Sequence, residues 1–148
     1  MKNFLLKLKQ FRQCSIVDKD FPQLREIVDA DIKWLLDKLP KIVCLCGSTK
    51  FKEAFNEANR SETLNGNLVI SVGLFGHDEN ANGGSLDFGS DENPSMLKLM
   101  LDELHLRKID LADEILVINV GGYIGKSTNK EIQYAMMTGK EVRYLEAK

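Results

Sequence analysis

The chain has 148 residues, of which 43% are hydrophobic and 28% charged, and its formal net charge is -2. This near balance of charge gives no indication of a nucleic-acid groove or of binding to an anionic membrane surface. No apolar run approaches the roughly 20 residues that span a bilayer, and the start of the chain lacks the apolar stretch of a signal peptide. We therefore predict a cytoplasmic protein that binds neither nucleic acid nor membrane.

Residues 1–40 are predicted to form a helical extension. Apolar residues recur there every four positions, which is the spacing of one helix face: Leu24, Val28, Ile32 and Leu36. Pro40 ends this pattern. The stripe indicates packing either on the rest of the domain or on a partner subunit.

From residue 41 onward, strands alternate with helices. The expected strands cover 42–46, 68–72, 115–119 and 141–145. Three helices are expected: one that follows the first strand and ends near residue 60, one over 95–111 and one over 128–138. A long loop over 73–94 is rich in glycine and acidic residues, and a loop of this length is typical of a functional segment. The alternation and the apolar strands predict an α/β domain over 41–148: a flavodoxin-like parallel sheet of four to five strands flanked by helices.

Ligands of open parallel sheets bind at the carboxyl ends of the strands, and three segments are expected to meet there. The segments are Gly47-Ser48-Thr49-Lys50, the loop containing Phe75 and His77, and the glycine turn Gly121-Gly122-Tyr123 with the following Ser127. A glycine turn that opens a helix offers free N–H groups and the positive end of the helix dipole to an anion. The turn is not a nucleotide-triphosphatase loop, because Val120 stands where that motif needs its first glycine.

Glu131, in the first turns of the last helix, allows two interpretations. Thr128-x-x-Glu131 fits a capping box, in which both side chains only satisfy backbone N–H groups. Alternatively, Glu131 points into the pocket as a nucleophile or general base. Tyr123 and Phe75 likewise suit either stacking on a base or packing in the core.

No metal ion or other cofactor is predicted. Cys44 and Cys46 flank Leu45 in an apolar strand and are interpreted as reduced core thiols, since a Cys-x-Cys pair without nearby His or Cys partners is a poor zinc site. His77 stands beside two acidic residues, but three adjacent side chains rarely converge on one ion. Asp113 is expected to accept hydrogen bonds from backbone N–H groups.

Three segments resemble the nucleoside 2-deoxyribosyltransferase superfamily, which includes the deoxynucleoside-monophosphate N-glycosidases. They are Lys41-Ile-Val-Cys-Leu-Cys-Gly-Ser-Thr-Lys, Ile109-Asp-Leu-Ala-Asp-Glu-Ile-Leu-Val-Ile-Asn and Ser127-Thr-Asn-Lys-Glu-Ile-Gln-Tyr-Ala, the last followed by Gly139-Lys-Glu-Val. The resemblance covers roughly residues 41–146. Its motifs are shared in part with other nucleotide-binding α/β families, including the lysine-decarboxylase-like phosphoribohydrolases.

The resemblance implies a chemistry in which a glutamate attacks the anomeric carbon of a deoxyribose and releases the base. Glu131 matches that nucleophile, and Ser48 and Lys50 match the loop that grips the 5′ end, with Ser127 as a further phosphate contact. The chain departs from the family at two auxiliary carboxylates, where His105 and Gly125 stand instead. His105, or Asp102 one turn earlier on the same helix, is expected to take over one of these roles.

The sequence therefore predicts cleavage or exchange of the N-glycosidic bond of a nucleoside, deoxynucleoside or 5′-monophosphate. One alternative is a non-catalytic sensor or binder of a nucleotide-derived ligand, which would explain the missing carboxylates. Another is a phosphoribohydrolase of a modified nucleoside monophosphate, favoured by Gly121-Gly122-Tyr123 but disfavoured by the longer spacing to Glu131. The resemblance also implies a homodimer or larger homo-oligomer.

Overall fold

The computed structural model describes residues 30, 31, 33, 34, 38–73 and 93–147. The chain divides into two compact units, Met1–Pro40 and Lys41–Lys148. Most of the helix expected before Pro40 lies outside the described residues, and so do Phe75, His77 and most of the 73–94 loop. The elements of the second unit carry the candidate site.

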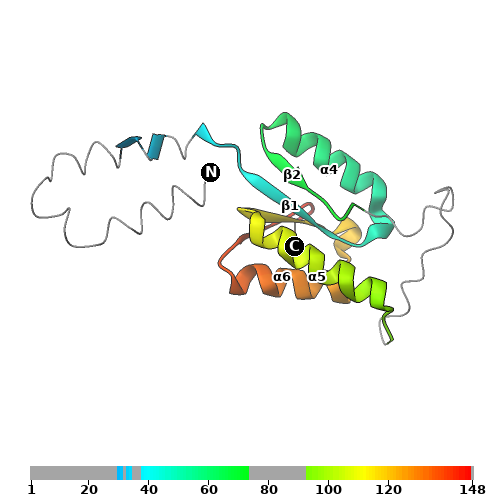
Figure 1. Ribbon diagram of the computed structural model, residues 1–148. Helices are drawn as coiled ribbons and strands as arrows, with labels where there is room; N and C mark the ends of the chain where they lie inside the picture. The colour runs from blue at the N-terminus through cyan, green and yellow to red at the C-terminus, as the bar shows by residue number, and fades with distance from the viewer. Residues whose placement is uncertain (1–29, 32, 35–37, 74–92, 148) are drawn as a thin grey trace, which may run out of the picture. The chain divides into compact units, whose positions relative to one another are not determined.

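The second unit contains a parallel sheet with helices on both faces, as the sequence predicts (Figure 1). The described strands, all parallel, are β1 (Ile42–Gly47), β2 (Leu68–Ile70), β3 (Glu114–Ile118) and β4 (Glu141–Tyr144), in the order β2-β1-β3-β4. The helices are α4 (Lys52–Leu64), α5 (Met96–Leu111) and α6 (Lys126–Met137), with short 3-10 turns at Thr49–Phe51 and Val120–Gly122. The strand order is the one found in flavodoxin-like sheets.

The alternation of side chains along the central strands produces two separate cores. One face of the sheet packs against α5 and α6 and contributes Cys44, Cys46, Ile115 and Val117. The other face packs against α4 and contributes Val43, Leu45, Leu116 and Ile118. Because both faces of β1 and β3 are covered, these strands are apolar apart from Glu114 at the start of β3, as expected for a buried parallel sheet. Figure 1 shows α4 on one side of the sheet and the α5–α6 pair on the other.

The strand order reverses between β1 and β3, so the carboxyl ends of these two strands form the switch point at which such sheets bind ligands. Gly47 ends β1 there. A Cβ atom on Gly47 would lie 2.9 Å from Cβ of Ile118 and 3.0 Å from its carbonyl oxygen. Only glycine therefore allows β1 and β3 to approach this closely at the switch point.

Local hydrogen bonds set the ends of the elements near the sequence-predicted positions. Ser95 caps α5, and its hydroxyl accepts from the backbone N–H of Lys98 at 3.2 Å. Gly139 follows α6 with a φ of 72°, the left-handed conformation expected after a helix. Asp113 accepts from the backbone N–H of Ile42 at 2.8 Å, which confirms its predicted structural role.

Within the described part of the chain, no helix is long and apolar enough to cross a membrane.

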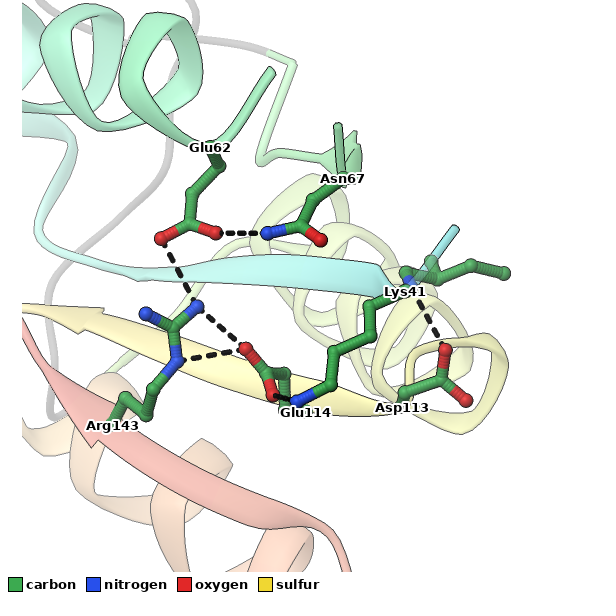
Figure 2. A network of polar contacts seen from close by, with 7 residues as sticks. Lys41, Glu62, Asn67, Asp113, Glu114 and Arg143 are labelled. Carbon is green, nitrogen blue, oxygen red and sulfur yellow. Dashed lines mark hydrogen bonds and ion pairs between the residues drawn. The ribbon is translucent and has the colours of Figure 1, made fainter. Parts of the chain in front are cut away.

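A cluster of charged side chains, here called the Arg143 cluster, links β4 and the amino ends of β1 and β3 to α4 (Figure 2). The Arg143 guanidinium lies between two carboxylates: Nε donates to Glu114 at 2.7 Å, and Nη2 lies 3.0 Å from Glu62. Lys41 donates to Glu114 and Asn67 donates to Glu62. The side chains line an open pocket of about 280 Å³. Glu62 and Glu114 are buried, so these contacts compensate the desolvation of two charges.

Candidate active site

Four side chains from three elements meet beneath α5 and α6, against the central strand. Cys44 and Cys46 project from β1 on the same face, because residues two apart in a strand share a face. The His105 Nε2 atom, from α5, lies 3.4 Å from Sγ of Cys46 and 3.9 Å from Sγ of Cys44. The same Nε2 atom lies 3.9 Å from Oε2 of Glu131, from α6. The structure thus brings His105 and Glu131 together, as required for a joint role.

Lys108 fixes α5 one turn after His105. Its ammonium group donates to the carbonyl oxygens of Ser71 at 2.8 Å and Val72 at 3.1 Å, just after β2. Because residues three apart lie on one helix face, this anchor holds His105 toward the sheet.

The cluster is buried and incompletely satisfied. The thiols of Cys44 and Cys46 are fully buried, and His105 and Glu131 are exposed by 5% and 9%. Among the residues that the structure describes, Nδ1 of His105 and Oε2 of Glu131 have no hydrogen-bond partner. Unpaired polar atoms are costly in a core, and in native proteins they often mark a place where a ligand, an ion or a reacting group acts.

Mutual interactions shift the pKa values of all four groups. Burial raises the pKa of the Glu131 carboxyl above its usual range, against the opposing charge of His105. Burial lowers the pKa of His105, but the contact with Cys44 and the charge of Glu131 outweigh burial and raise it overall. Interaction with Cys46 lowers the pKa of Cys44 to about 6, and interaction with Cys44 raises that of Cys46. The lowered pKa belongs to Cys44, although His105 Nε2 lies closer to Cys46. Because the two thiols titrate together, we assign the lowered pKa to the pair and not to one of them.

Glu131 does not serve as a helix cap. The residue at the N-cap of α6 is Gly125, and no side chain makes a capping hydrogen bond there. Thr128 lies inside the first turn of the helix and is buried, so the capping-box interpretation of Thr128 and Glu131 is wrong. The helix begins two residues earlier than expected, so Glu131 lies in its second turn, where it contacts His105 of α5.

Asp102 and Ser127 are joined by a lysine that the sequence analysis did not select. The Lys98 ammonium lies 2.8 Å from Oδ2 of Asp102 and donates to the hydroxyl of Ser127 at 3.0 Å. Lys98 thereby links α5 to the first turn of α6. Asp102 is thus paired with this lysine, and its charge contributes to the raised pKa of Glu131.

Lys50 and Tyr123 lie together at the switch point. The Lys50 ammonium lies 3.2 Å from the ring centroid of Tyr123 and 4.8 Å from that of Phe51, a cation–π arrangement. Phe51 and Tyr123 themselves meet edge to face at 5.9 Å. Ser48 and Thr49 precede this group and are half-buried in the turn after Gly47. The first and third predicted segments therefore do meet.

The glycine turn has the predicted backbone conformation, but one of its N–H groups is engaged. Gly121 and Gly122 have φ values of 61° and 75°, which other residues rarely adopt. The N–H of Gly121 donates to a carboxylate oxygen of Glu146 at 2.9 Å. Asn119 fixes this contact by exchanging two hydrogen bonds with the backbone of Glu146. A ligand that used the Gly121 N–H would have to displace the Glu146 side chain.

Besides Lys98, the sequence analysis did not place Cys44 and Cys46 in the site. The premise that these thiols lack a histidine partner is wrong, because α5 delivers His105 to them from about 60 positions away in the sequence. The available signal was the spacing itself, since two cysteines at i and i+2 of a strand share one face.

Comparisons of the chain with protein-family models, with curated proteins and with solved structures gave no match. The function must therefore be argued from the geometry of the site.

Proposed function

We propose that this protein cleaves or exchanges the N-glycosidic bond of a deoxynucleoside or its 5′-monophosphate, with Glu131 as the nucleophile. The position of Glu131 carries the proposal. It is a buried carboxyl group beside the switch point of a parallel sheet, it has no capping role, and its Oε2 atom has no hydrogen-bond partner among the described residues. A carboxylate held in this way is available to a reacting carbon.

The proposed reaction has two displacements at the anomeric carbon of the sugar. The Glu131 carboxylate forms a bond to this carbon while the bond to the base breaks, and the departing nitrogen takes the bonding electrons and then a proton. A water molecule or a second base next attacks the same carbon and releases the Glu131 carboxylate. The imidazole of His105 lies 3.9 Å from Glu131. When protonated, it stabilises the negative charge of the carboxylate, and it accepts and donates the protons of the reaction.

A substrate panel tests this proposal directly. The purified full-length protein is incubated with ribo- and deoxynucleosides and their 5′-monophosphates, and free base is measured by chromatography. We expect release of base from at least one deoxynucleoside or deoxynucleotide. If no base is released but one of these compounds raises the melting temperature, the catalytic proposal is wrong and the alternative of a nucleotide sensor is supported.

Two lysines are expected to recognise a 5′-phosphate. Lys50 stands at the switch point, and Lys98 already contacts the hydroxyl of Ser127 at the start of α6. Because each charge-assisted hydrogen bond contributes about 1.5–3 kcal/mol, Lys50→Ala and Lys98→Ala should each weaken monophosphate binding by roughly 10- to 150-fold. The nucleoside, which lacks the phosphate, should be affected far less.

Steady-state kinetics with matched nucleoside and monophosphate substrates measure this difference. Lys130→Ala is the control, because Lys130 is an exposed residue of α6. An equal loss for both substrates would argue against a phosphate contact.

The exposed face of α5 supports the proposal that the protein self-associates. This helix is apolar on both sides: Ile109 packs on the sheet, while Leu99, Met100 and Leu104 are about half exposed. Large apolar side chains that gather on the exposed side of a helix often mark a contact with another protein chain.

We expect light scattering after size exclusion to show a dimer or larger oligomer for the natural chain and a monomer for Leu104→Glu. Leu64→Glu, which makes the same change at an exposed position of α4, should behave as the natural chain does. A monomeric natural chain at high concentration would refute self-association.

A further inference from the structure

The two thiols and the imidazole that surround Glu131 have the composition of a site for a soft metal ion. The Sγ atoms of Cys44 and Cys46 and a ring nitrogen of His105 all lie within 4.8 Å of one another, and all three residues are buried. Thiolate and imidazole are the ligands that zinc prefers, whereas magnesium and calcium prefer oxygen.

The two sulfur–nitrogen distances fit a tetrahedral ion closely. With bonds of about 2.3 Å to sulfur and about 2.0 Å to nitrogen, tetrahedral zinc holds a sulfur and a nitrogen ligand about 3.6 Å apart. The two Sγ–Nε2 distances are 3.4 Å and 3.9 Å. Both sulfur–nitrogen distances therefore lie within about 0.3 Å of the value expected for a tetrahedral zinc site.

Glu131 supplies the fourth position. Its Oε2 atom lies 3.9 Å from Nε2 of His105, is buried, and has no hydrogen-bond partner among the described residues. Two ligands of tetrahedral zinc bound through oxygen and nitrogen lie about 3.3 Å apart. A metal ion would thus satisfy the Oε2 atom and give four ligands from β1, α5 and α6.

We propose that Cys44, Cys46, His105 and Glu131 form a binding site for Zn²⁺ or a similar thiophilic divalent ion. The metal part of this inference stands on the ligand geometry alone. Its consequence for turnover rests on the proposed function: a metal-bound Glu131 cannot attack the sugar, so the ion would hold the enzyme inactive until it is removed.

The test begins with full-length protein whose thiols have been reduced and whose metal has been removed by a chelator. We expect one Zn²⁺ per chain in competition with a chromophoric chelator. Co²⁺ should give an intense sulfur-to-metal charge-transfer band and the visible bands of a tetrahedral complex. X-ray absorption of the zinc form should show two sulfur ligands. The two spectroscopic measurements need no variant, so they decide the proposal even if every variant fails to fold.

Variants identify the ligands. Cys46→Ala and His105→Ala should weaken Zn²⁺ binding by at least about 100-fold, since even the loss of outer partners of a metal ligand costs 10- to 100-fold. Cys14→Ala, which removes the third thiol of the chain, is the matched control and should bind zinc as the natural chain does. Absence of the cobalt charge-transfer band, unchanged affinity in Cys46→Ala, or lost affinity in Cys14→Ala would each overturn the proposed site.

The activity assay separates the two proposals. If base release is observed, one equivalent of Zn²⁺ should suppress it and a chelator should restore it. If the protein shows the cobalt spectrum but releases no base from any substrate, the metal site is supported and the proposed function is wrong. If it releases base but gives no cobalt band, the proposed function is supported and the metal site is wrong.

Discussion

Replacing Glu131 by glutamine is expected to abolish base release while the protein remains folded. An amide cannot form the bond to the anomeric carbon, and loss of a catalytic nucleophile typically lowers turnover by at least about 10⁴-fold. Stability should change little, within about 1 kcal/mol, because burial already raises the pKa of Glu131 and disfavours its charged form. Turnover and thermal unfolding, measured on the same preparation, give both quantities.

Glu103→Gln is the matched control, since it makes the same chemical change at an exposed position of α5. A further result would distinguish a nucleophile from a residue that merely positions others. In Glu131→Ala, azide or formate should restore base release by attacking the sugar in place of the carboxylate. A folded Glu131→Gln protein with undiminished turnover would eliminate the nucleophile assignment.

Arg143→Met is expected to produce the largest loss of stability. It leaves the buried carboxylates of Glu62 and Glu114 without the guanidinium that lies between them. Removing one partner of a buried ion pair costs 3–5 kcal/mol, and we expect about 3 kcal/mol here because the Arg143 side chain is 37% exposed. Chemical denaturation at neutral pH measures this loss.

The loss should depend on pH in a defined direction. Burial raises the pKa of Glu114, but the hydrogen bonds from Lys41 and Arg143 outweigh it and hold the pKa below the ordinary value of 4.5. The stability that Glu114 contributes is therefore fully present above pH 4.5 and declines as the pH falls through the lowered pKa. In Arg143→Met this contribution is smaller. The difference in the free energy of unfolding between Arg143→Met and the natural chain should therefore become smaller as the pH is lowered below 4.5.

Arg60→Met is the control for this experiment, because Arg60 and its partner Glu57 are both 72% exposed on α4. Such a surface pair should contribute no more than about 0.5 kcal/mol. If Arg143→Met cost as little as Arg60→Met, the Arg143 cluster would not be a stabilising feature.

The sequence predicted the sheet more accurately than the site. Strands such as Ile42–Gly47 were recognisable because burial on both faces makes them apolar along their whole length. The role of Asp113 was also predictable, since it depends on neighbours at a single helix-to-strand junction. Both inferences use information contained within a few consecutive residues.

The errors concern the exact start of one helix and contacts between distant segments. The pattern of Thr128 and Glu131 was compatible with a capping box, and only the actual start of α6 at Lys126 excludes it. The pairing of His105 with the thiols of β1 depends on the rotation of α5 about its axis, which no local pattern specifies. Lys98 was missed for the same reason, because its partner Ser127 is on another helix.

The Arg143 cluster and the candidate active site lie on opposite faces of the same two central strands. Glu114 alternates with Ile115 along β3 and binds Arg143, which also reaches Glu62 of α4, whereas Cys44 and Cys46 face α5 and α6. Sites that are separated by a sheet and share no partners contribute almost additively to the free energy of folding. The chain can therefore accumulate changes on the face of the candidate site and offset their cost on the other face, so new specificity can evolve here without the loss of a folded protein.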